Sequence, residues 1–258
     1  MQHQARKRFG QNFLHDPQVI QRIIHAINPQ VGENFVEIGP GMGALTEPLL
    51  QRLGTEKPLN VIELDRDLAR KLEEHYGDKL NIHQCDALKF DFSQLSQTPQ
   101  KLRIIGNLPY NISTPLLFHL LAQVTVVKDM VFMLQKEVVD RIIANAGDNA
   151  YGRLSVVMAY HCHREKLFNV GAGAFNPAPK VDSSILYLRP HDNPPVDVGD
   201  FLQFKQLVTM AFANRRKTLR NNLKKCLSAE QIEQVGIDPS QRAERLSLED
   251  FARLSCLL

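Results

Sequence analysis

The amino-acid sequence predicts an α/β protein with a mostly parallel sheet, followed by a small C-terminal domain made only of helices. In the first 190 residues, short apolar runs alternate with helix-like segments. This pattern is typical of βαβ units whose parallel strands are covered on both faces. A proline-rich stretch at 190–195 then separates this region from segments with helical spacing alone. We therefore expect one domain over residues 1–190 and a second over residues 198–258.

The predicted elements of the first domain begin with a helix. Asp16 and Pro17 have the chemistry of an N-cap and a first helical residue, and apolar residues follow them at helical spacing up to Ile27. Strand-like runs come next, at 35–38, 61–64, 81–84, 103–105 and 130–134. Two later runs, around 167–170 and 184–188, are expected to complete the sheet as an antiparallel edge.

The C-terminal region shows three helical patterns. Residues 204–212 carry one apolar stripe, and Leu219, Leu223 and Leu227 continue with a spacing of four. Arg216, Arg220 and Lys224 repeat with the same spacing on another face, which predicts a basic ridge along the second helix. The segment 247–250, Ser-Leu-Glu-Asp, resembles a capping box and predicts the start of a final helix.

Composition narrows the class of protein. The 258 residues are 43% hydrophobic and 23% charged, which is ordinary globular material, and no apolar run approaches the roughly 18 residues that span a bilayer. The N-terminus is basic, without the apolar segment of a signal peptide. The four cysteines are scattered, so we expect free thiols in the cytosol and no structural zinc.

Charge alone leaves the partner open. The net charge of +3 permits a polyanionic partner, and basic residues concentrate at 6–8 and 215–225. Such runs are most often solvated faces, so they do not by themselves indicate nucleic acid.

A glycine-rich loop follows the first predicted strand. Residues 37–44 read Glu-Ile-Gly-Pro-Gly-Met-Gly-Ala, and Gly39 and Gly41 would let the backbone approach a ligand closely. The carboxyl end of this strand is where open α/β sheets bind nucleotides. The loop also satisfies G-x-G-x-x-G/A, so a nicotinamide or flavin enzyme remains an alternative.

Carboxylates end the next two predicted strands. Glu63 stands where an acid would bind the two ribose hydroxyls, and Asp86 stands where an acid would accept the exocyclic amine of an adenine. A dehydrogenase has no standard need for Asp86. A helix N-cap is the alternative for each acid, and for Asp86 alone it explains the residue nearly as well, but the register of the acids at successive strand ends favours an adenosine site.

The fourth strand ends in an unusual sequence. Residues 106–111, Gly-Asn-Leu-Pro-Tyr-Asn, follow the apolar run 102–105. Turn chemistry explains such residues about equally well, because proline fixes φ and asparagine bonds its own backbone.

These motifs together resemble those of the class I S-adenosylmethionine-dependent methyltransferases. Residues 107–110 resemble the (N/D)-x-P-(Y/F/W) motif of enzymes that methylate amino groups. The similarity extends to the ribosomal RNA adenine dimethyltransferase family that modifies the small-subunit RNA, over essentially the whole chain. Its signatures correspond to residues 7–14, 106–113, 134–138, 175–183 and 215–221. The resemblance implies a Rossmann-like, seven-stranded, mostly parallel methyltransferase sheet and S-adenosylmethionine as the cofactor.

The chemistry of the motif follows from the poor nucleophilicity of an adenine amine, whose lone pair is delocalised into the ring. The Asn107 side-chain carbonyl and the Leu108 backbone carbonyl are expected to accept its two N–H bonds and so return the lone pair to the nitrogen. Pro109 would hold that backbone in place, and Tyr110 would stack on the base. The resemblance makes Phe175 the second stacking face, and a buried core phenylalanine is the alternative.

The resemblance also implies several partners. Asn12 and Leu14 would close over the methionine end of the cofactor, and Asn107 would contribute to the same site. The RNA would be bound through the basic residues Arg215, Arg216, Lys217, Arg220 and Lys224.

The implied substrate is a pair of adjacent adenosines in a hairpin loop near the 3′ end of 16S ribosomal RNA. They would be methylated within an immature 30S particle by a monomeric cytoplasmic enzyme during ribosome biogenesis. Three alternatives remain: a nicotinamide-dependent oxidoreductase, a non-catalytic assembly factor, and a relative that methylates large-subunit RNA. The tail after Arg189 argues against the last.

Overall fold

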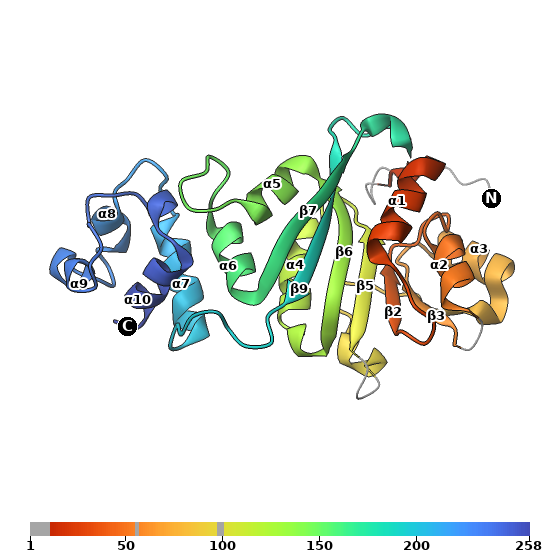
Figure 1. Cartoon of the computed structure of the whole chain (residues 1–258), viewed down its shortest axis with the longest axis horizontal. Helices are drawn as coiled ribbons and strands as arrows, with labels where there is room; N and C mark the ends of the chain where they lie inside the picture. Colours follow the sequence, from red (N-terminus) through yellow and green to blue (C-terminus); the bar gives the residue numbers. More distant parts are fainter. Residues whose placement is uncertain (1–10, 55–56, 97–100) are drawn as a thin grey trace. The chain divides into compact units, whose positions relative to one another are not determined.

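The computed structural model describes residues 11–54, 57–96 and 101–258, and these form two compact units (Figure 1). The first unit contains the described residues up to Val139 together with Glu165–Pro190, and the second contains Asp140–Arg164 and His191–Leu258. The chain passes into the C-terminal part of the second unit after Pro190, where the sequence placed the boundary. Residues 140–164 also belong to the second unit, although the sequence analysis assigned them to the first domain. Their side chains Ala144, Tyr151 and Val156 are buried in the core of the second unit.

The first unit is built on a seven-stranded sheet with the order β4-β3-β2-β5-β6-β9-β7. Neighbours from β4 to β6 are parallel, and β9 is antiparallel to β6. The predicted fold class and all seven strand-like runs are confirmed. The sequence did not indicate that β9 lies between β6 and β7. The strands are β2 (Phe35–Ile38), β3 (Leu59–Ile62), β4 (Leu80–His83), β5 (Leu102–Asn107), β6 (Val127–Gln135), β7 (Cys162–Val170) and β9 (Ser183–Pro190).

The first helix forms as its cap predicts. Asp16 accepts hydrogen bonds from the backbone N–H groups of Gln18 and Val19, and Pro17 occupies the first turn. Three isoleucines of this helix, Ile23, Ile24 and Ile27, pack into the core that β2, β3 and β5 also line. The helices that begin in the first unit are α1 (Pro17–Ile27), α2 (Thr46–Leu53), α3 (Arg66–Tyr76), α4 (Ser113–Leu121) and α5 (Lys136–Ile143), with 3-10 turns at Gly77–Lys79, Phe92–Leu95, Val124–Val126 and Ala172–Ala174.

A second, two-stranded sheet ties the N-terminal segment to a loop far along the chain. β1 (Phe13–Leu14) pairs antiparallel with β8 (Phe175–Asn176), and the His15 N–H donates to the Ala174 carbonyl at 2.9 Å. This pairing fixes the position of residues 11–14 beside the large sheet.

The second unit is helical, as predicted, and its last helix has the expected cap. Ser247 and Asp250 form a reciprocal capping box, and the stripe at 204–212 lies on α7. None of the helices in the described parts of either unit has both the length and the apolar character needed to cross a bilayer. The helices of this unit are α6 (Arg153–His161), α7 (Phe201–Ala211), α8 (Leu219–Leu223), α9 (Ala229–Gln234) and α10 (Leu248–Ser255), with a 3-10 turn at Ala243–Arg245.

The predicted basic ridge along the second of these C-terminal helices is wrong. α8 has five residues, so Arg216 lies in the turn before it and Lys224 is its C-cap. The first backbone donors of the helix, Leu219 and Arg220, bond to the carbonyls of Gln241 and Pro239, outside the helix. The apolar spacing was informative about burial, since Leu219, Leu223 and Leu227 are all in the core.

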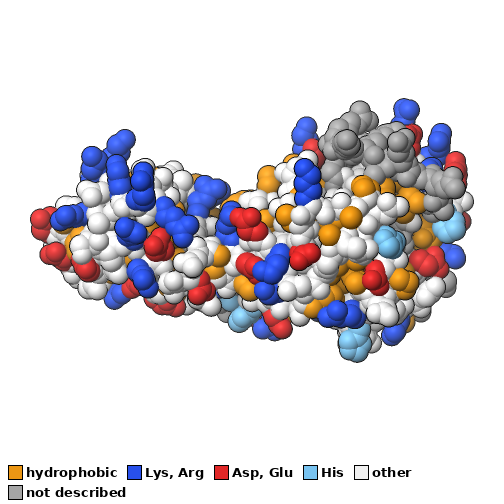
Figure 2. All heavy atoms as spheres, turned by 90° about the horizontal axis from the view of Figure 1, so that it is seen from above, with side chains coloured by type: hydrophobic (Ala, Val, Ile, Leu, Met, Phe, Trp, Pro, Cys, Tyr) orange, Lys and Arg blue, Asp and Glu red, His pale blue; other side chains and the backbone are white. Residues whose placement is uncertain are grey.

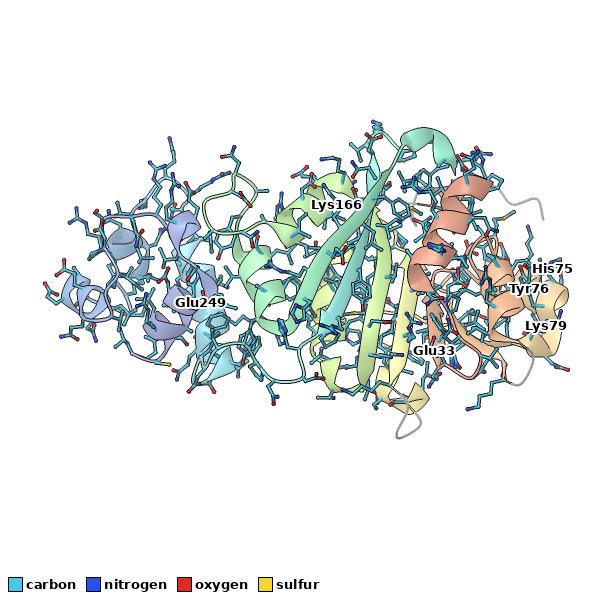
Figure 3. The ribbon with its side chains drawn as sticks, in the orientation of Figure 1. Glu33, His75, Tyr76, Lys79, Lys166 and Glu249 are labelled. Atoms are coloured by element: carbon cyan, nitrogen blue, oxygen red, sulfur yellow. The ribbon has the colours of Figure 1, made fainter. Side chains whose placement is uncertain are left out.

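A buried ion network lies at the amino ends of β5 and β6, opposite to the strand ends that the sequence singled out. Arg103 of β5 donates to Asp129 of β6 at 2.9 Å and to Glu33 at 2.6 Å. Its remaining nitrogen donates to the Ile27 carbonyl at the end of α1 at 2.8 Å. Lys128, which is mostly exposed, adds a 2.7 Å contact to Glu33, and Figure 3 labels Glu33. One guanidinium therefore joins two strands, a helix end and a loop.

We expect Arg103→Met to lower the free energy of unfolding by about 3–5 kcal/mol, because it leaves two carboxylates without their buried counter-charge. Urea denaturation measures this change. The matched variant Lys128→Met removes an exposed cation from the same network and is expected to cost less than about 1 kcal/mol. Equal costs for the two variants would show that burial of Arg103 has no special weight.

Candidate active site

A cavity of about 370 Å³ lies at the carboxyl ends of the central strands. Every predicted catalytic and cofactor-binding residue lines it, with the single exception of Phe175. The members are Asn12, Leu14, Gly39, Gly41, Glu63, Asp86, Asn107, Leu108, Pro109 and Tyr110. The structure therefore brings together motifs that lie far apart in the chain.

Parallel pairing places the polar residues in a row. Asp86 follows β4, Glu63 follows β3, Glu37 lies in β2, and Asn107 ends β5. These four strands are consecutive neighbours in the sheet. The cavity is thus lined by carboxylates on one side and by the Asn-Leu-Pro-Tyr motif on the other.

The glycine loop is held tightly between its neighbours. Gly41 adopts a φ of 59°, and its N–H donates to a Glu63 carboxylate oxygen at 3.3 Å. Gly43 adopts a φ of 85°, and a Cβ at that position would lie 2.6 Å from the Tyr76 hydroxyl. Tyr76 is the last residue of α3 (Figure 3). The loop needs glycine here for two reasons, because the backbone is left-handed and no space is left for a side chain.

Glu63 is fixed by backbone donors. One of its oxygens accepts from the Asp65 N–H at 2.8 Å, and the other accepts from Gly41. Burial raises the pKa of Glu63, and these hydrogen bonds oppose that rise. The carboxylate is therefore oriented before any ligand binds.

Asp86 is not the N-cap of a helix, the alternative that the sequence left open, because a turn follows it and the next helical element starts at Phe92. Its Oδ1 accepts from the Leu88 N–H at 3.0 Å, which is a local turn bond. The side chain also lines the cavity.

Asn107 is oriented by the N-terminal segment. Its Nδ2 donates to the backbone carbonyl of Asn12 at 2.9 Å, which assigns the other end of the amide, Oδ1, as an acceptor. Asn12 therefore acts on Asn107 through its main chain, a contact that the sequence could not reveal.

Hydrogen bonds also fix the backbone after Asn107. Leu108 donates its N–H to the Met133 carbonyl at 3.2 Å. The Pro109 carbonyl accepts from Ser113 Oγ and from the Ile112 N–H. No group of the described residues donates to the Leu108 carbonyl or to Asn107 Oδ1. The two predicted acceptors are thus available in a rigid frame.

Tyr110 is half-buried and held by its hydroxyl, which lies 2.8 Å from Ser183 Oγ. Burial raises the pKa of this phenol, so it is neutral at physiological pH. Phe175 does not line the cavity: it is 3% exposed and packs in the core with Leu14 and Ala174. Its role as a second stacking face stays a prediction. The aromatic ring that lines the cavity besides Tyr110 is Phe13.

Glu37 is the functional candidate to which the sequence analysis gave no role. It is 2% exposed, lines the cavity, and accepts a 2.7 Å hydrogen bond from Thr46 Oγ1. Burial raises its pKa to about 7; the Thr46 bond opposes the shift and the charge of Glu63 adds to it. The signal was present in the sequence, since an acid within the apolar run Phe-Val-Glu-Ile is unusual unless it has a buried role.

The lining residues favour a cationic ligand. Among the described residues that line the cavity there are carboxylates but no lysine, arginine or histidine. The pyrophosphate of a nicotinamide dinucleotide would gain no positive side chain here, whereas a sulfonium nucleoside would be stabilised. No group of three or more His, Cys, Asp or Glu within the described ranges is arranged to hold a metal ion.

Comparison with known proteins is consistent with this site. The family model described as ribosomal RNA adenine dimethylase matches residues 2–258. The chain belongs to this family. It is 55% identical over 256 residues to a ribosomal RNA small subunit methyltransferase A of Pseudomonas putida, covering 98% of this chain and 95% of that protein. The same protein of Pseudomonas aeruginosa is also 55% identical, covering 98% and 94%.

Solved structures share the fold over the same length. A dimethyladenosine transferase from Plasmodium falciparum superposes with a TM-score of 0.75 at 28% identity, covering 94% of this chain and 95% of that one. The 23S rRNA methyltransferase ErmE has a TM-score of 0.73 at 24% identity, covering 95% and 98%, and shows the fold alone.

Family membership makes this chain an S-adenosylmethionine-dependent methyltransferase that acts on adenine in ribosomal RNA, and it excludes the oxidoreductase alternative. The bound cofactor supplies an electrophilic methyl group on a positively charged sulfur. The residues present fit that cofactor: Asp86 and Glu63 would hold its adenosine, and Glu37 would lie in the same cavity wall, on the strand beside the one that ends at Asn107.

The predicted RNA-binding residues belong to the second unit and are not among the residues that line the cavity. Arg215, Arg216, Lys217, Arg220 and Lys224 are all exposed, and Figure 2 shows many Lys and Arg side chains over this unit. Arg215 also has intramolecular partners, the Asn149 carbonyl at 2.8 Å and Glu244 at 3.5 Å. The first four residues of the N-terminal signature, 7–10, lie outside the described residues.

We expect Gly43→Ala to weaken S-adenosylmethionine binding at least tenfold, because the new methyl group collides with Tyr76 and displaces the loop. Isothermal titration measures the affinity. The matched control is Gly32→Ala, since Gly32 has a similar φ of 83° but no atom within 4 Å of its Cβ position. That variant has only the backbone strain of about 1–2 kcal/mol.

The same collision predicts a rescue. Tyr76→Phe removes the hydroxyl oxygen that the added methyl group would strike, so combining it with Gly43→Ala is expected to restore part of the affinity. If Gly32→Ala and Gly43→Ala bind equally well, or if Tyr76→Phe restores nothing, the close packing of the loop is not what the cofactor site depends on.

Proposed function

We propose that this enzyme dimethylates the N6 amines of two adjacent adenosines in a hairpin loop near the 3′ end of small-subunit ribosomal RNA. It acts as a cytoplasmic monomer on an immature 30S particle, during ribosome biogenesis. Near-full-length identity of 55% to proteins named small subunit methyltransferase A supports the choice of subunit. The observation that carries the chemistry is the Asn107 amide, fixed by the Asn12 carbonyl with its oxygen free to accept.

The two fixed acceptors activate the amine. Asn107 Oδ1 and the Leu108 carbonyl each accept one N–H bond of the adenine amine, which draws the nitrogen toward tetrahedral geometry and frees its lone pair. The nitrogen then attacks the methyl carbon, and the carbon–sulfur bond breaks as the nitrogen–carbon bond forms. A proton leaves the nitrogen after attack. No general base is needed before the bond forms.

Tyr110 holds the base for this attack. Stacking one base on one aromatic ring contributes about 1–3 kcal/mol, and the Ser183 contact keeps the ring in place. An adenosine in a loop suits this pocket, because an unpaired base is unstacked at little cost.

The second methylation uses the same frame with one contact fewer. After the first transfer the nitrogen carries one hydrogen, so one of the two carbonyl acceptors remains engaged. The first methyl group then has to be accommodated in the cavity beside the half-buried Tyr110.

The second unit is proposed to bind the RNA backbone. Arg216, Lys217 and Lys224 are exposed, and no ion pair within the described residues occupies them. Their side chains are therefore available for phosphates, which supply most of the sequence-independent affinity.

Transfer of labelled methyl from S-adenosylmethionine to immature 30S particles, followed by mass spectrometry of the nucleosides, tests the proposed reaction. We expect dimethyladenosine at two adjacent positions with the wild-type enzyme, and neither methylation with Asn107→Ala. The control Asn81→Ala removes an exposed asparagine of β4 and is expected to retain activity. Full dimethylation by Asn107→Ala would contradict the acceptor mechanism, and no labelled adenosine with the wild-type enzyme would contradict the substrate.

The salt dependence of binding to 30S particles tests the RNA surface. Each phosphate contact contributes about 0.9 to the slope of log K against log salt on duplex RNA, by analogy with B-DNA, or about 0.7 on a single strand. We expect Lys217→Gln to lower the slope by about one such unit. Lys79→Gln, an exposed lysine of the first unit, is expected to leave the slope unchanged. The same slope for both variants would remove Lys217 from the RNA surface.

A further inference from the structure

Glu37 is a buried acid, and no positively charged side chain among the described residues of the cavity compensates its carboxylate. It lies in β2, is 2% exposed, and forms part of the cavity wall. Its only side-chain hydrogen bond to the described residues is the 2.7 Å bond from Thr46 Oγ1. A carboxylate in such a place is costly to ionise unless a positive charge compensates it, and no lysine, arginine or histidine lines the described cavity.

The sheet order indicates which part of the cofactor Glu37 faces. Of the carboxylates in the row, Glu37 lies on the strand directly beside β5, which ends at Asn107. Gly39, two residues further on, neighbours the end of β5: a Cβ at Gly39 would be in ordinary van der Waals contact with the Asn107 carbonyl oxygen, at 3.9 Å. The methyl group must lie next to Asn107, so the sulfur that carries it lies nearer to Glu37 than to Glu63 or Asp86.

Besides burial, two groups of the protein act on the ionisation of Glu37: the charge of Glu63, after β3, opposes it, and the hydrogen bond from Thr46 of α2 favours it. The phenol of Tyr76, at the end of α3, interacts with Glu37 and is neutral, since burial raises its pKa to about 12. None of them carries a positive charge. A cation that enters the cavity therefore favours the ionised form of Glu37.

We propose that Glu37 is the residue that distinguishes the sulfonium cofactor from its neutral thioether product, by releasing a proton when the cation binds and regaining one when the methyl group has left. The inference rests on the methyl-transfer function. The protons balance over one turnover: the acid loses a proton on cofactor binding, the amine loses one after methylation, and Glu37 takes one up beside the thioether. The net release is one proton per methyl group, and the product is left with weaker electrostatic attraction, which favours its exit.

Isothermal titration at pH 7 in buffers of different ionisation enthalpy measures the protons released on binding. Because the pKa of Glu37 is about 7 in the free protein, we expect release of about half a proton per S-adenosylmethionine. The same release is expected for an analogue with a protonated amine in place of the sulfonium. S-adenosylhomocysteine should release much less. Equal release with the sulfonium and the thioether would overturn the proposal.

The pH dependence of selectivity has a definite sign. Below pH 7 the cation must expel a proton in order to bind, and above pH 7 Glu37 is already ionised. The ratio of the dissociation constants, thioether to sulfonium, is therefore expected to rise about five- to tenfold from pH 6 to pH 8. A flat ratio in the wild-type protein would contradict the role of Glu37.

Three variants separate this role from a structural one. Glu37→Gln keeps the shape and an acceptor for Thr46, and should abolish both the proton release and the rise in the ratio. Thr46→Val removes a bond that favours the ionised form, so the midpoint of the rise should move to higher pH. Glu47→Gln changes an exposed acid on the same helix as Thr46 and should leave the proton release unchanged.

The outcomes distinguish this inference from the proposed function. If the wild-type protein fails to bind S-adenosylmethionine, the methyl-transfer function itself is wrong. If it binds and methylates RNA but releases no proton, only the role of Glu37 is wrong. If Glu37→Gln does not fold, the direction of the midpoint shift in Thr46→Val decides the matter, and a shift to lower pH or none contradicts it.

Discussion

The parallel pairing of β4, β3, β2 and β5 is the constraint on which the site depends. Parallel strands end at the same edge of a sheet, so a side chain near each carboxyl end faces one cavity. Asp86, Glu63, Glu37 and Asn107 come into a row for this reason alone. An extended nucleoside with a charged sulfur matches that row from one end to the other, and the methyl acceptor is met at its last position.

The charge network that joins the strands lies at their amino ends, opposite to the carboxyl ends that line the cavity. Arg103 and Asp129 pair across β5 and β6, and the same guanidinium reaches α1 and Glu33. The apolar pattern of β5 sets its register, and a buried arginine with three partners reinforces it, because a shift of one residue would leave charges unpaired. The position of Asn107 at the other end of β5 follows from that register.

Rigidity in this protein is concentrated around the groups that act on the amine. The Asn12 carbonyl sets the Asn107 amide, Met133 holds Leu108, and Ser183 holds the Tyr110 ring. Each contact comes from a different part of the chain. The charges of the cavity are not balanced within the protein in this way. Its described lining residues include buried acids and no cation, so the positive charge has to come from the cofactor.

The sequence by itself determined the elements and the residues at their ends. Local features of this kind depend on neighbours within a few positions, so the sequence alone predicts them. They include the cap at Asp16, the seven strand-like runs and the acids Glu63 and Asp86. Tertiary structure alone decided the rest. Three features depend on residues that are distant in the chain. They are the position of β9 between β6 and β7, the burial of Phe175 and the main-chain role of Asn12. The same holds for α8, which is short because Gln241 and Pro239 take the bonds that a longer helix would have used. Periodicity reports which side of an element is apolar, but only the packing of distant segments decides what covers that side.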